Sequence, residues 1–337
     1  MSVAFVFPGQ GSQYVGMGRD LYETYPEARR VFDEADEILG FPLSKLCFEG
    51  PAEMLNDTIN TQPAILTTIV ALLRVLERKG IWKSEPNGNN GYRANGGGLH
   101  TTPLFMAGHS LGEYCTLAAT QSLDFATLLL LARERGRLMR DAGQYRPGGM
   151  AAILGLEAET VDVLCQEASQ GGRGIVQAAN YNSPGQIVIS GDKAALEEAM
   201  TLAKARGARR VIPLAVSIAA HSPLMEYAAE RFRLVVEAIP LREPAVPIVA
   251  NVTAAPATKV GAIKNELLQQ LTSSVRWTES VQYMIGRGVT TFVEVGPKNV
   301  LQGLIRRIDG RVQTNWVGNV DSVEALVRRV NQAYVLN

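Results

Sequence analysis

The sequence contains little cysteine, and this shortage excludes two classes of protein. Cys47, Cys115 and Cys165 are odd in number, and none belongs to a Cys-x-x-Cys pair. We therefore expect neither a disulfide framework nor a metal site. Such cysteine usage is typical of a reducing compartment, so the expected location is the cytoplasm.

The sequence also lacks an excess of either charge and any long hydrophobic run. Its 33 basic residues balance 33 acidic ones, so no surface for a polyanion is indicated and we expect no nucleic-acid partner. The apolar run at residues 3–7 has no basic residue before it and meets Pro8 too early for a signal sequence. We find no stretch that approaches the ~20 apolar residues of a membrane span, and we expect no membrane partner.

The residues that are present predict an α/β fold. Hydrophobic residues make up 46% of the 337 residues, enough for one large domain with an insertion or for two domains. A buried strand is expected at 3–7, and the longest amphipathic helix at 61–79, with Pro63 in its first turn. Residues 83–103 are rich in glycine and asparagine and predict a flexible surface loop inserted into the fold.

Shorter elements follow in the segment 147–215. Strands are predicted at 150–156, 175–179, 186–190 and 210–216, with helices at 158–168 and 193–206. This βαββαβ order is typical of a ferredoxin-like unit. We therefore predict a small subdomain, 147–215, inserted into a large one that comprises 1–146 and 216–337.

The residues around Ser110 predict a nucleophile. An apolar strand enters Gly108-His109-Ser110-Leu111-Gly112, and a helix-forming run follows, which is the context in which Gly-x-Ser-x-Gly forms a nucleophile elbow. Glycine on both sides suits a sharp turn without room for side chains. The alternative is an ordinary glycine turn, which the strand before and the helix after disfavour.

A serine hydroxyl needs a base, and the chain has only three histidines. His100 lies in the predicted loop, and His109 should turn its side chain away from Ser110 because it precedes the nucleophile in a strand-to-turn geometry. His221 remains as the candidate base, between a predicted strand and a predicted helix. A buried histidine held by a backbone carbonyl is the alternative for this position.

Two further polar residues stand at informative positions. A helix is predicted from a cap at Asp124 to residue 140. On this helix Arg135 shares an apolar stripe with Leu128 and Met139. Both a structural ion pair with a core carboxylate and a clamp for a ligand carboxylate fit this pattern, and the pattern alone does not choose. Gln10 follows the strand 3–7, where open α/β sheets bind ligands, although a surface turn is the simpler interpretation.

Six motifs occur in a fixed order along the chain. They are Pro8-Gly9-Gln10-Gly11-Ser12-Gln13, Gly108-His109-Ser110-Leu111-Gly112-Glu113-Tyr114, Arg135-Gly136, Asn182-Ser183-Pro184-Gly185-Gln186, Ala220-His221-Ser222-Pro223 and Glu294-Val295-Gly296-Pro297. In this order they resemble the malonyl-CoA:acyl carrier protein transacylase family and are similar also to polyketide synthase acyltransferases. The resemblance implies a free-standing monomer without a cofactor, with an α/β-hydrolase-like large subdomain on a mostly parallel sheet and a ferredoxin-like small one.

The resemblance also implies roles in catalysis. Ser110 would attack an acyl-CoA thioester, and His221 would take its proton. The backbone N–H groups of Gln10 and Leu111 would hold the oxyanion. A main-chain carbonyl near Arg276 would orient the histidine.

Further residues would recognise the acyl group. By the resemblance Arg135 would hold a malonyl carboxylate bidentately, and the other candidates for substrate binding are His109, Asn182, Gln186, Ile218 and Ala220. Malonyl-specific relatives commonly carry Gly-Ala-Phe before the histidine, where this chain has Ile-Ala-Ala. The missing ring predicts space for substituted malonyl groups.

The implied reaction moves a malonyl-type acyl group from CoA to the phosphopantetheine thiol of an acyl carrier protein through an acyl-serine, in fatty acid or polyketide biosynthesis. The alternatives are an editing acyl hydrolase, an acyltransferase for substituted malonyl units and a non-catalytic binding protein. Carrier proteins are acidic, and two basic clusters are candidates for docking them, Lys204, Arg206, Arg209 and Arg210, and Lys298, Arg306, Arg307 and Arg311. Solvated helix faces explain the same clusters equally well.

Overall fold

The fold is built on two separate sheets. The structure, a computed structural model, describes residues 2–82 and 102–335, so almost all of the loop predicted at 83–103 lies outside the described residues. The strands are β1 (Val3–Phe7), β2 (Phe105–Gly108), β3 (Gly148–Leu154), β4 (Val176–Ser183), β5 (Gln186–Asp192), β6 (Arg210–Pro213), β7 (Ile248–Val249), β8 (Pro256–Ala257), β9 (Thr291–Val295) and β10 (Gln313–Val317).

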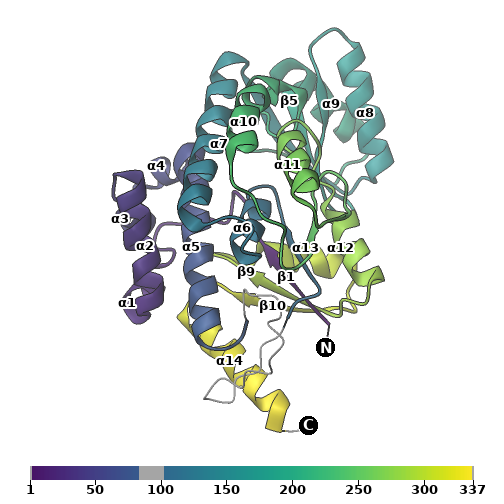
Figure 1. Cartoon of the computed structure of the whole chain (residues 1–337). Coiled ribbons are helices and arrows are strands. Elements are labelled where there is room, and N and C mark those ends of the chain that lie inside the picture. The colour runs from purple at the N-terminus through teal and green to yellow at the C-terminus, as the bar shows by residue number, and fades with distance from the viewer. Residues whose placement is uncertain (1, 83–101, 336–337) are drawn as a thin grey trace.

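Helices surround both sheets (Figure 1). They are α1 (Arg19–Thr24), α2 (Pro26–Leu39), α3 (Leu43–Glu49), α4 (Ala52–Asn56), α5 (Thr58–Arg78), α6 (Leu111–Ala119), α7 (Phe125–Tyr145), α8 (Ala158–Gln170), α9 (Lys193–Ala205), α10 (Glu226–Ala238), α11 (Val260–Gln269), α12 (Trp277–Gly286), α13 (Val300–Ile308) and α14 (Val320–Val335), with a short 3-10 helix at Pro223–Met225.

The first sheet, sheet A, is mostly parallel and is buried on both faces. Its order is β10-β9-β1-β2-β7-β8, and every pair except β7 with β8 is parallel. Strand side chains alternate between faces, so Phe5 and Phe7 join the core that includes α5 and α6. Ala4 and Val6 join a second core with α12 and α13. Burial on both faces explains why β1 is apolar throughout, and the predicted mostly parallel sheet is confirmed.

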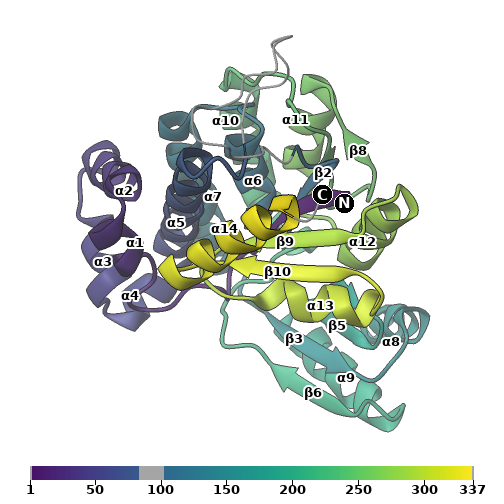
Figure 2. The same ribbon diagram turned by 90° about the horizontal axis from the view of Figure 1, so that it is seen from below.

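The second sheet, sheet B, is antiparallel and carries α8 and α9. Its order is β4-β5-β3-β6 along a βαββαβ chain, which is the predicted ferredoxin-like arrangement. A separate apolar core packs α8 and α9 against it. Figure 2 shows this unit at one end of the molecule, beside sheet A. These elements run from 148 to 213, inside the predicted range 147–215, and the subdomain boundaries themselves stay a prediction.

Two long helices differ from their predicted bounds. α5 begins at Thr58, before the predicted start at 61, because the Asp57 side chain caps it by accepting a hydrogen bond from the Ile59 N–H. Pro63 consequently lies inside the helix, not in its first turn. α7 begins after the predicted Asp124 cap but continues to Tyr145, past the predicted end at 140.

α5 is also the described helix that is long and apolar enough to span a membrane. By its length and composition alone this helix could cross a membrane, so the expectation that the chain has no such stretch was wrong. The most apolar window of α5 is nevertheless 83% buried inside the protein, where the helix packs against α2, α6 and α7. Burial of this extent is typical of a core helix.

Candidate active site

Ser110 lies at a sharp turn between β2 and α6. Its backbone has φ 53° and ψ −109°, outside the regions that residues other than glycine favour. The flanking glycines make the turn possible. A Cβ on Gly108 would lie 1.9 Å from the carbonyl carbon of Gly112, and one on Gly112 would lie 2.0 Å from the main-chain oxygen of Phe7. The predicted strand, turn and helix are confirmed, and the turn packs against the end of β1.

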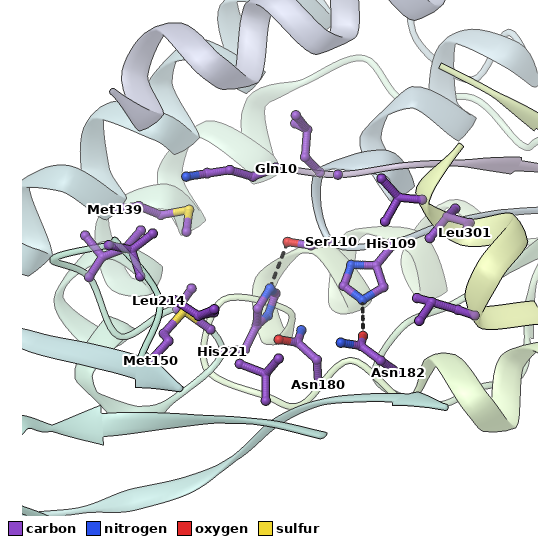
Figure 3. Close-up of a pocket in the computed structure, with 18 of the residues that line it drawn as sticks. Gln10, His109, Ser110, Met139, Met150, Asn180, Asn182, Leu214, His221 and Leu301 are labelled. Carbon is purple, nitrogen blue, oxygen red and sulfur yellow. Dashed lines mark hydrogen bonds between the residues drawn. The ribbon is translucent and has the colours of Figure 1, made fainter. Parts of the chain in front are cut away.

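Ser110 and His221 point toward each other (Figure 3). The Ser110 Oγ lies 2.8 Å from His221 Nε2, and on the other side of the ring Nδ1 lies 2.8 Å from the main-chain oxygen of Gln270. A carbonyl can only accept, so Nδ1 carries the ring proton and Nε2 is free to accept from the serine hydroxyl. This is the arrangement of a nucleophile with its base.

The carbonyl that orients His221 belongs to Gln270, so the predicted position near Arg276 was wrong. Gln270 directly follows α11. The last carbonyl groups of a helix receive no hydrogen bond from within the helix, so the Gln270 oxygen can accept one from His221. The Arg276 side chain instead pairs with Glu279 at the start of α12. Sequence could not locate this contact because every residue has a main-chain carbonyl.

Burial determines the protonation state of His221. The residue is 3% exposed, and burial, followed by the positive charge of Arg135, lowers its pKa to about 3. His221 is therefore neutral near pH 7, as a proton acceptor must be. Its backbone has φ 59°, and the Gln177 side chain supports this strained loop by donating a hydrogen bond of 2.9 Å to the His221 main-chain oxygen.

Arg135 is buried beside Ser110, and no carboxylate of the described residues lies within ion-pair distance of it. It is 1% exposed; Nη1 donates to Gln62 Oε1 at 2.9 Å, and Nη2 donates to Gln270 Oε1 at 2.9 Å and to Ser110 Oγ at 3.3 Å. Among residues 2–82 and 102–335, no ion pair includes Arg135. The structural ion pair that fitted the sequence pattern is thus absent from this part of the chain. The acceptors that contact the guanidinium are neutral, and the Glu113 carboxyl acts on its charge without contacting it.

Gln10 and Leu111 border the same cavity as the serine. Leu111 begins α6, and the first N–H groups of a helix have no acceptor within it. Gly9 allows the two loops to meet, because a Cβ there would lie 2.4 Å from the His109 main-chain oxygen. Gln10 is exposed, as expected of a residue in a surface turn. Its side chain is nevertheless held, because Oε1 accepts a hydrogen bond of 2.9 Å from Thr58 Oγ1.

A cavity of about 250 Å³ extends from Ser110 and Arg135 toward sheet B. One side consists of the loops that follow β1 and β2, and the other of residues from β3, β4 and β5. The apolar part of the wall is formed by Met139, Met150, Val188, Leu214, Val216, Ile218, Ala220, Val300, Leu301 and Leu304. Both predicted wall residues before the histidine, Ile218 and Ala220, are therefore at the cavity.

The other predicted substrate-binding residues also border the cavity, but their side chains already have partners. His109 Nε2 lies 2.7 Å from Asn182 Oδ1, so the ring turns away from Ser110 as predicted (Figure 3). Burial lowers the pKa of His109. Gln186 accepts a hydrogen bond from Arg307. These groups shape the cavity wall through contacts with one another.

The buried polar residues that support the serine turn were not predicted from the sequence. Asn251 Oδ1 accepts from the Ser110 N–H at 2.8 Å, and its Nδ2 donates to the Gly108 main-chain oxygen at 2.6 Å. The Glu113 carboxylate accepts from the Asn251 N–H at 3.0 Å and from the Gln270 side chain. The available signal was Glu113 itself, a carboxylate in an otherwise apolar helix, which requires buried partners.

The three cysteines are free and buried. Among the residues that the structure describes, no cluster of three or more His, Cys, Asp or Glu side chains is placed to hold a metal ion.

An elbow serine with a neutral histidine base, on an α/β sheet, is the site of an acyl-transferring enzyme. The chain belongs to the acyl transferase family, since the family described as Acyl transferase domain matches residues 4–311. This match extends from β1 to the loop before β10 and includes both sheets' contributions to the cavity.

Two relatives that match nearly the whole chain have the same name. Malonyl CoA-acyl carrier protein transacylase of Bacillus subtilis strain 168 is 44% identical over 330 residues, 98% of this chain and 98% of that protein. The protein of the same name from Escherichia coli K12 is 43% identical over 305 residues, 90% of this chain and 92% of that protein. Among solved structures, a malonyl-transacylase in complex with its type II PKS acyl-carrier protein has a TM-score of 0.89 at 39% identity, over 98% of this chain and 100% of that one. The Vibrio cholerae acyl carrier protein S-malonyltransferase has a TM-score of 0.87 at 40% identity, over 97% and 100%.

Proposed function

We propose that this acyltransferase moves a malonyl group from CoA to the phosphopantetheine thiol of an acyl carrier protein, in fatty acid or polyketide biosynthesis. The observation that carries the proposal is the buried guanidinium of Arg135, which lies 3.3 Å from the Ser110 hydroxyl and has no ion pair with any residue that the structure describes. A malonyl group on this serine would bring its free carboxylate within reach of the guanidinium, whose planar fork suits a carboxylate. The names of the full-length relatives support the same reaction.

In the first half-reaction, Ser110 Oγ attacks the thioester carbonyl carbon while His221 Nε2 takes the hydroxyl proton. A C–O bond forms, and the carbonyl oxygen becomes an oxyanion that the N–H groups of Gln10 and Leu111 stabilise, each by ~3 to 4 kcal/mol. The C–S bond then breaks, and His221 returns the proton to the CoA thiolate. The product is a malonyl ester of Ser110.

In the second half-reaction, the carrier thiol replaces CoA. His221 takes the thiol proton as the sulfur attacks the ester, the same two N–H groups hold the oxyanion, and the proton returns to Ser110 Oγ as the C–O bond breaks. Groups of this chain stabilise or neutralise every charge that develops in both halves. We therefore propose that the reaction needs no metal or redox cofactor.

The apolar wall favours substituted malonyl groups as additional substrates. Ala220 directly precedes the base and borders the cavity, together with Ile218, Met150 and Leu214. An alkyl group on the α-carbon of the acyl chain would contact this wall, and each buried CH₂ contributes ~0.8 kcal/mol. A phenylalanine ring at the position of Ala220 would occupy the same space.

We propose that the carrier docks beside α13. Val300, the first residue of this helix, is 43% exposed and borders the cavity, and Arg307 on the same helix contacts Gln186 in the cavity wall. The basic charges of this end of the protein would attract an acidic carrier. Charge reversal at Arg307 and Lys298 should slow transfer to the carrier, whereas reversal at Arg210 in the other cluster should not. Equal rates for both variants would contradict this docking site.

We also propose that the protein is a cytoplasmic monomer. Its three free, buried cysteines suit a reducing compartment. The dyad, Arg135 and the cavity all come from one chain, so the reaction requires no second copy. Light scattering during size-exclusion chromatography would give the mass in solution, and a dimer mass would contradict the monomer.

Intact-mass spectrometry tests the reaction most directly. After incubation with malonyl-CoA, we expect the mass to rise by one malonyl group, and addition of a phosphopantetheinylated carrier should remove it. Ser110→Ala should show no adduct. Release of free malonate without a carrier would instead favour an editing hydrolase, and the absence of an adduct with every acyl-CoA tested would favour a non-catalytic binding protein.

A further inference from the structure

A continuous chain of hydrogen bonds joins Arg135 to Gln10. Arg135 Nη1 donates to Gln62 Oε1 at 2.9 Å, Gln62 Nε2 donates to Thr58 Oγ1 at 3.1 Å, and Thr58 Oγ1 donates to Gln10 Oε1 at 2.9 Å. The chain therefore starts at the group that would bind the acyl carboxylate. It ends on the residue whose N–H would bind the oxyanion.

The directions of the first two bonds in this chain are determined by the guanidinium. Arginine can only donate, so the Gln62 oxygen must face Arg135 and the Gln62 NH₂ group must face Thr58. A flipped amide would place NH₂ hydrogens against the cation. The hydroxyl of Thr58 thus receives a hydrogen bond from one side and gives its own proton to Gln10 on the other. A hydroxyl does both through one atom, which the methyl group of a valine in its place cannot.

The packing of α7 on α5 brings these residues together. A Cβ on Gly136 would lie 2.5 Å from the Thr58 main-chain oxygen and 2.9 Å from the Ile59 Cα, so the two helix backbones touch at this point. Arg135 is the neighbour of that glycine. Gln62 is fully buried and Thr58 is 6% exposed, so water cannot readily replace either as a partner.

We propose that Thr58 is a positioning residue that couples the carboxylate clamp to the oxyanion loop. Its hydroxyl holds the Gln62 amide in the orientation that Arg135 needs and at the same time holds the Gln10 side chain. This inference rests on the proposed malonyl transfer. It adds that recognition of the carboxylate and placement of the oxyanion donor depend on one hydroxyl group, which touches neither the substrate nor Ser110.

Removing the Thr58 hydroxyl should weaken the binding of the malonyl carboxylate by Arg135 more than it slows the acylation steps that all acyl groups share. In Thr58→Val, the buried Gln62 NH₂ group loses its oxygen acceptor and keeps only the weakly accepting Met139 Sδ at 3.3 Å. The amide is then free to turn, which moves the oxygen that holds Arg135. Exposed Gln10 can bond to water instead, so it is disturbed less. We expect kcat/KM for malonyl-CoA to fall about tenfold or more, as for loss of a hydrogen bond to a charged group, and kcat/KM for acetyl-CoA to fall clearly less.

The experiment measures kcat/KM for acylation by malonyl-CoA and by acetyl-CoA in four proteins, wild type, Thr58→Val, Thr58→Ser and Thr68→Val. Thr58→Ser keeps the hydroxyl and should keep the wild-type ratio of the two substrates. Thr68→Val is the matched control, because Thr68 is equally buried on the same helix and its hydroxyl donates only to Ala64 of that helix. A lowered ratio in Thr58→Val alone supports the coupling.

Two results would overturn the inference. One is a Thr58→Val enzyme whose substrate ratio equals that of Thr68→Val, and the other is a loss by the same factor for both substrates. If Thr58→Val does not fold, Thr58→Cys, whose thiol accepts hydrogen bonds only weakly, tests the same contact with Gln62 and should lower the ratio, while an unchanged ratio would reject the coupling. A wild-type protein that does not accept malonyl at Ser110 would refute the proposed function instead.

Discussion

The guanidinium of Arg135 and the imidazole of His221 converge on one atom, Oγ of Ser110, at 3.3 and 2.8 Å. The cation therefore acts on both partners of the proton transfer. It disfavours a second positive charge on His221, and it favours negative charge on the serine oxygen. A base with a low pKa is thus matched by a hydroxyl that gives up its proton more easily.

The pH dependence of acylation should reflect this environment. Because the pKa of His221 is lowered to about 3, the fraction of enzyme with a protonated, inactive His221 becomes large only when the pH approaches that value. We expect kcat/KM for acetyl-CoA to stay level from about pH 8 to about pH 5. Initial rates of CoA release at constant ionic strength measure it, and an acid limb centred on the ordinary histidine pKa near 6.5 would contradict the prediction.

Arg135→Ala should have two effects that can be measured separately. Loss of the carboxylate partner should lower kcat/KM for malonyl-CoA by about 10- to 100-fold relative to acetyl-CoA. Loss of the charge should raise the pKa of His221, so the acid limb with acetyl-CoA should move to higher pH. Arg137→Ala is the control, because Arg137 lies on the same helix but pairs with Glu134 and Asp141 at the surface. The same response in both variants would exclude a specific role for Arg135.

Gly136→Ala should destabilise the protein. Its Cβ would lie 2.5 Å from the Thr58 main-chain oxygen, so α5 and α7 would have to separate, at a cost of about 1–3 kcal/mol. Gly303→Ala is the matched control in α13, where a Cβ would meet nothing within 4 Å, and it should stabilise the helix by up to about 1 kcal/mol. Urea unfolding gives both values. Equal urea midpoints for Gly136→Ala and the wild type would contradict the prediction, because α5 and α7 would then accommodate the added methyl group without loss of stability.

Glu294 should make stability depend on pH. Its carboxylate accepts hydrogen bonds from the N–H groups of Leu301 and Gln302, yet burial raises its pKa from 4.5 to about 7. A raised carboxyl pKa means that the folded state binds the proton more tightly than the unfolded state does. The stability that this provides is complete below about pH 4.5 and is lost as the pH rises to about 7, by as much as ~3 kcal/mol.

The comparison with Glu294→Gln isolates this effect, because glutamine does not titrate. The free energy of unfolding of the wild type, minus that of the variant, should decrease between about pH 5 and pH 7. Urea titrations at several pH values measure the difference. Two parallel curves would mean that Glu294 has an ordinary pKa in the folded protein.

Ala220 should widen the choice of acyl group. We expect methylmalonyl-CoA and ethylmalonyl-CoA to be used within a hundredfold of malonyl-CoA, and Ala220→Phe to reduce their use far more than that of malonyl-CoA. Competition among the acyl-CoAs, read by intact mass, gives the ratios. A wild-type preference for malonyl of a hundredfold or more, roughly 2.7 kcal/mol, would reject the prediction.

Local patterns in the sequence predicted the parts of the site that depend on neighbouring residues. The glycines around Ser110 predicted its turn, and Asp124 predicted the start of α7. The contacts that orient the groups were not predictable in this way, because they join residues far apart in the chain. His221 meets the main chain of Gln270 across 49 positions, and Arg135 meets Gln62 across 73. No periodicity encodes such pairs, since they arise only when whole helices pack.

The cavity receives its reactive groups and its opposite wall from different parts of the fold. Ser110, His221 and Arg135 belong to the elements around sheet A, whereas Met150 and Val188 come from β3 and β5 of sheet B. Variation within sheet B can therefore reshape the acyl-binding space while the proton-transfer geometry stays intact. This division marks Met150 and Val188 as positions to vary when a different acyl group is wanted, while Gln177 of the same sheet has to be kept because it holds the His221 loop.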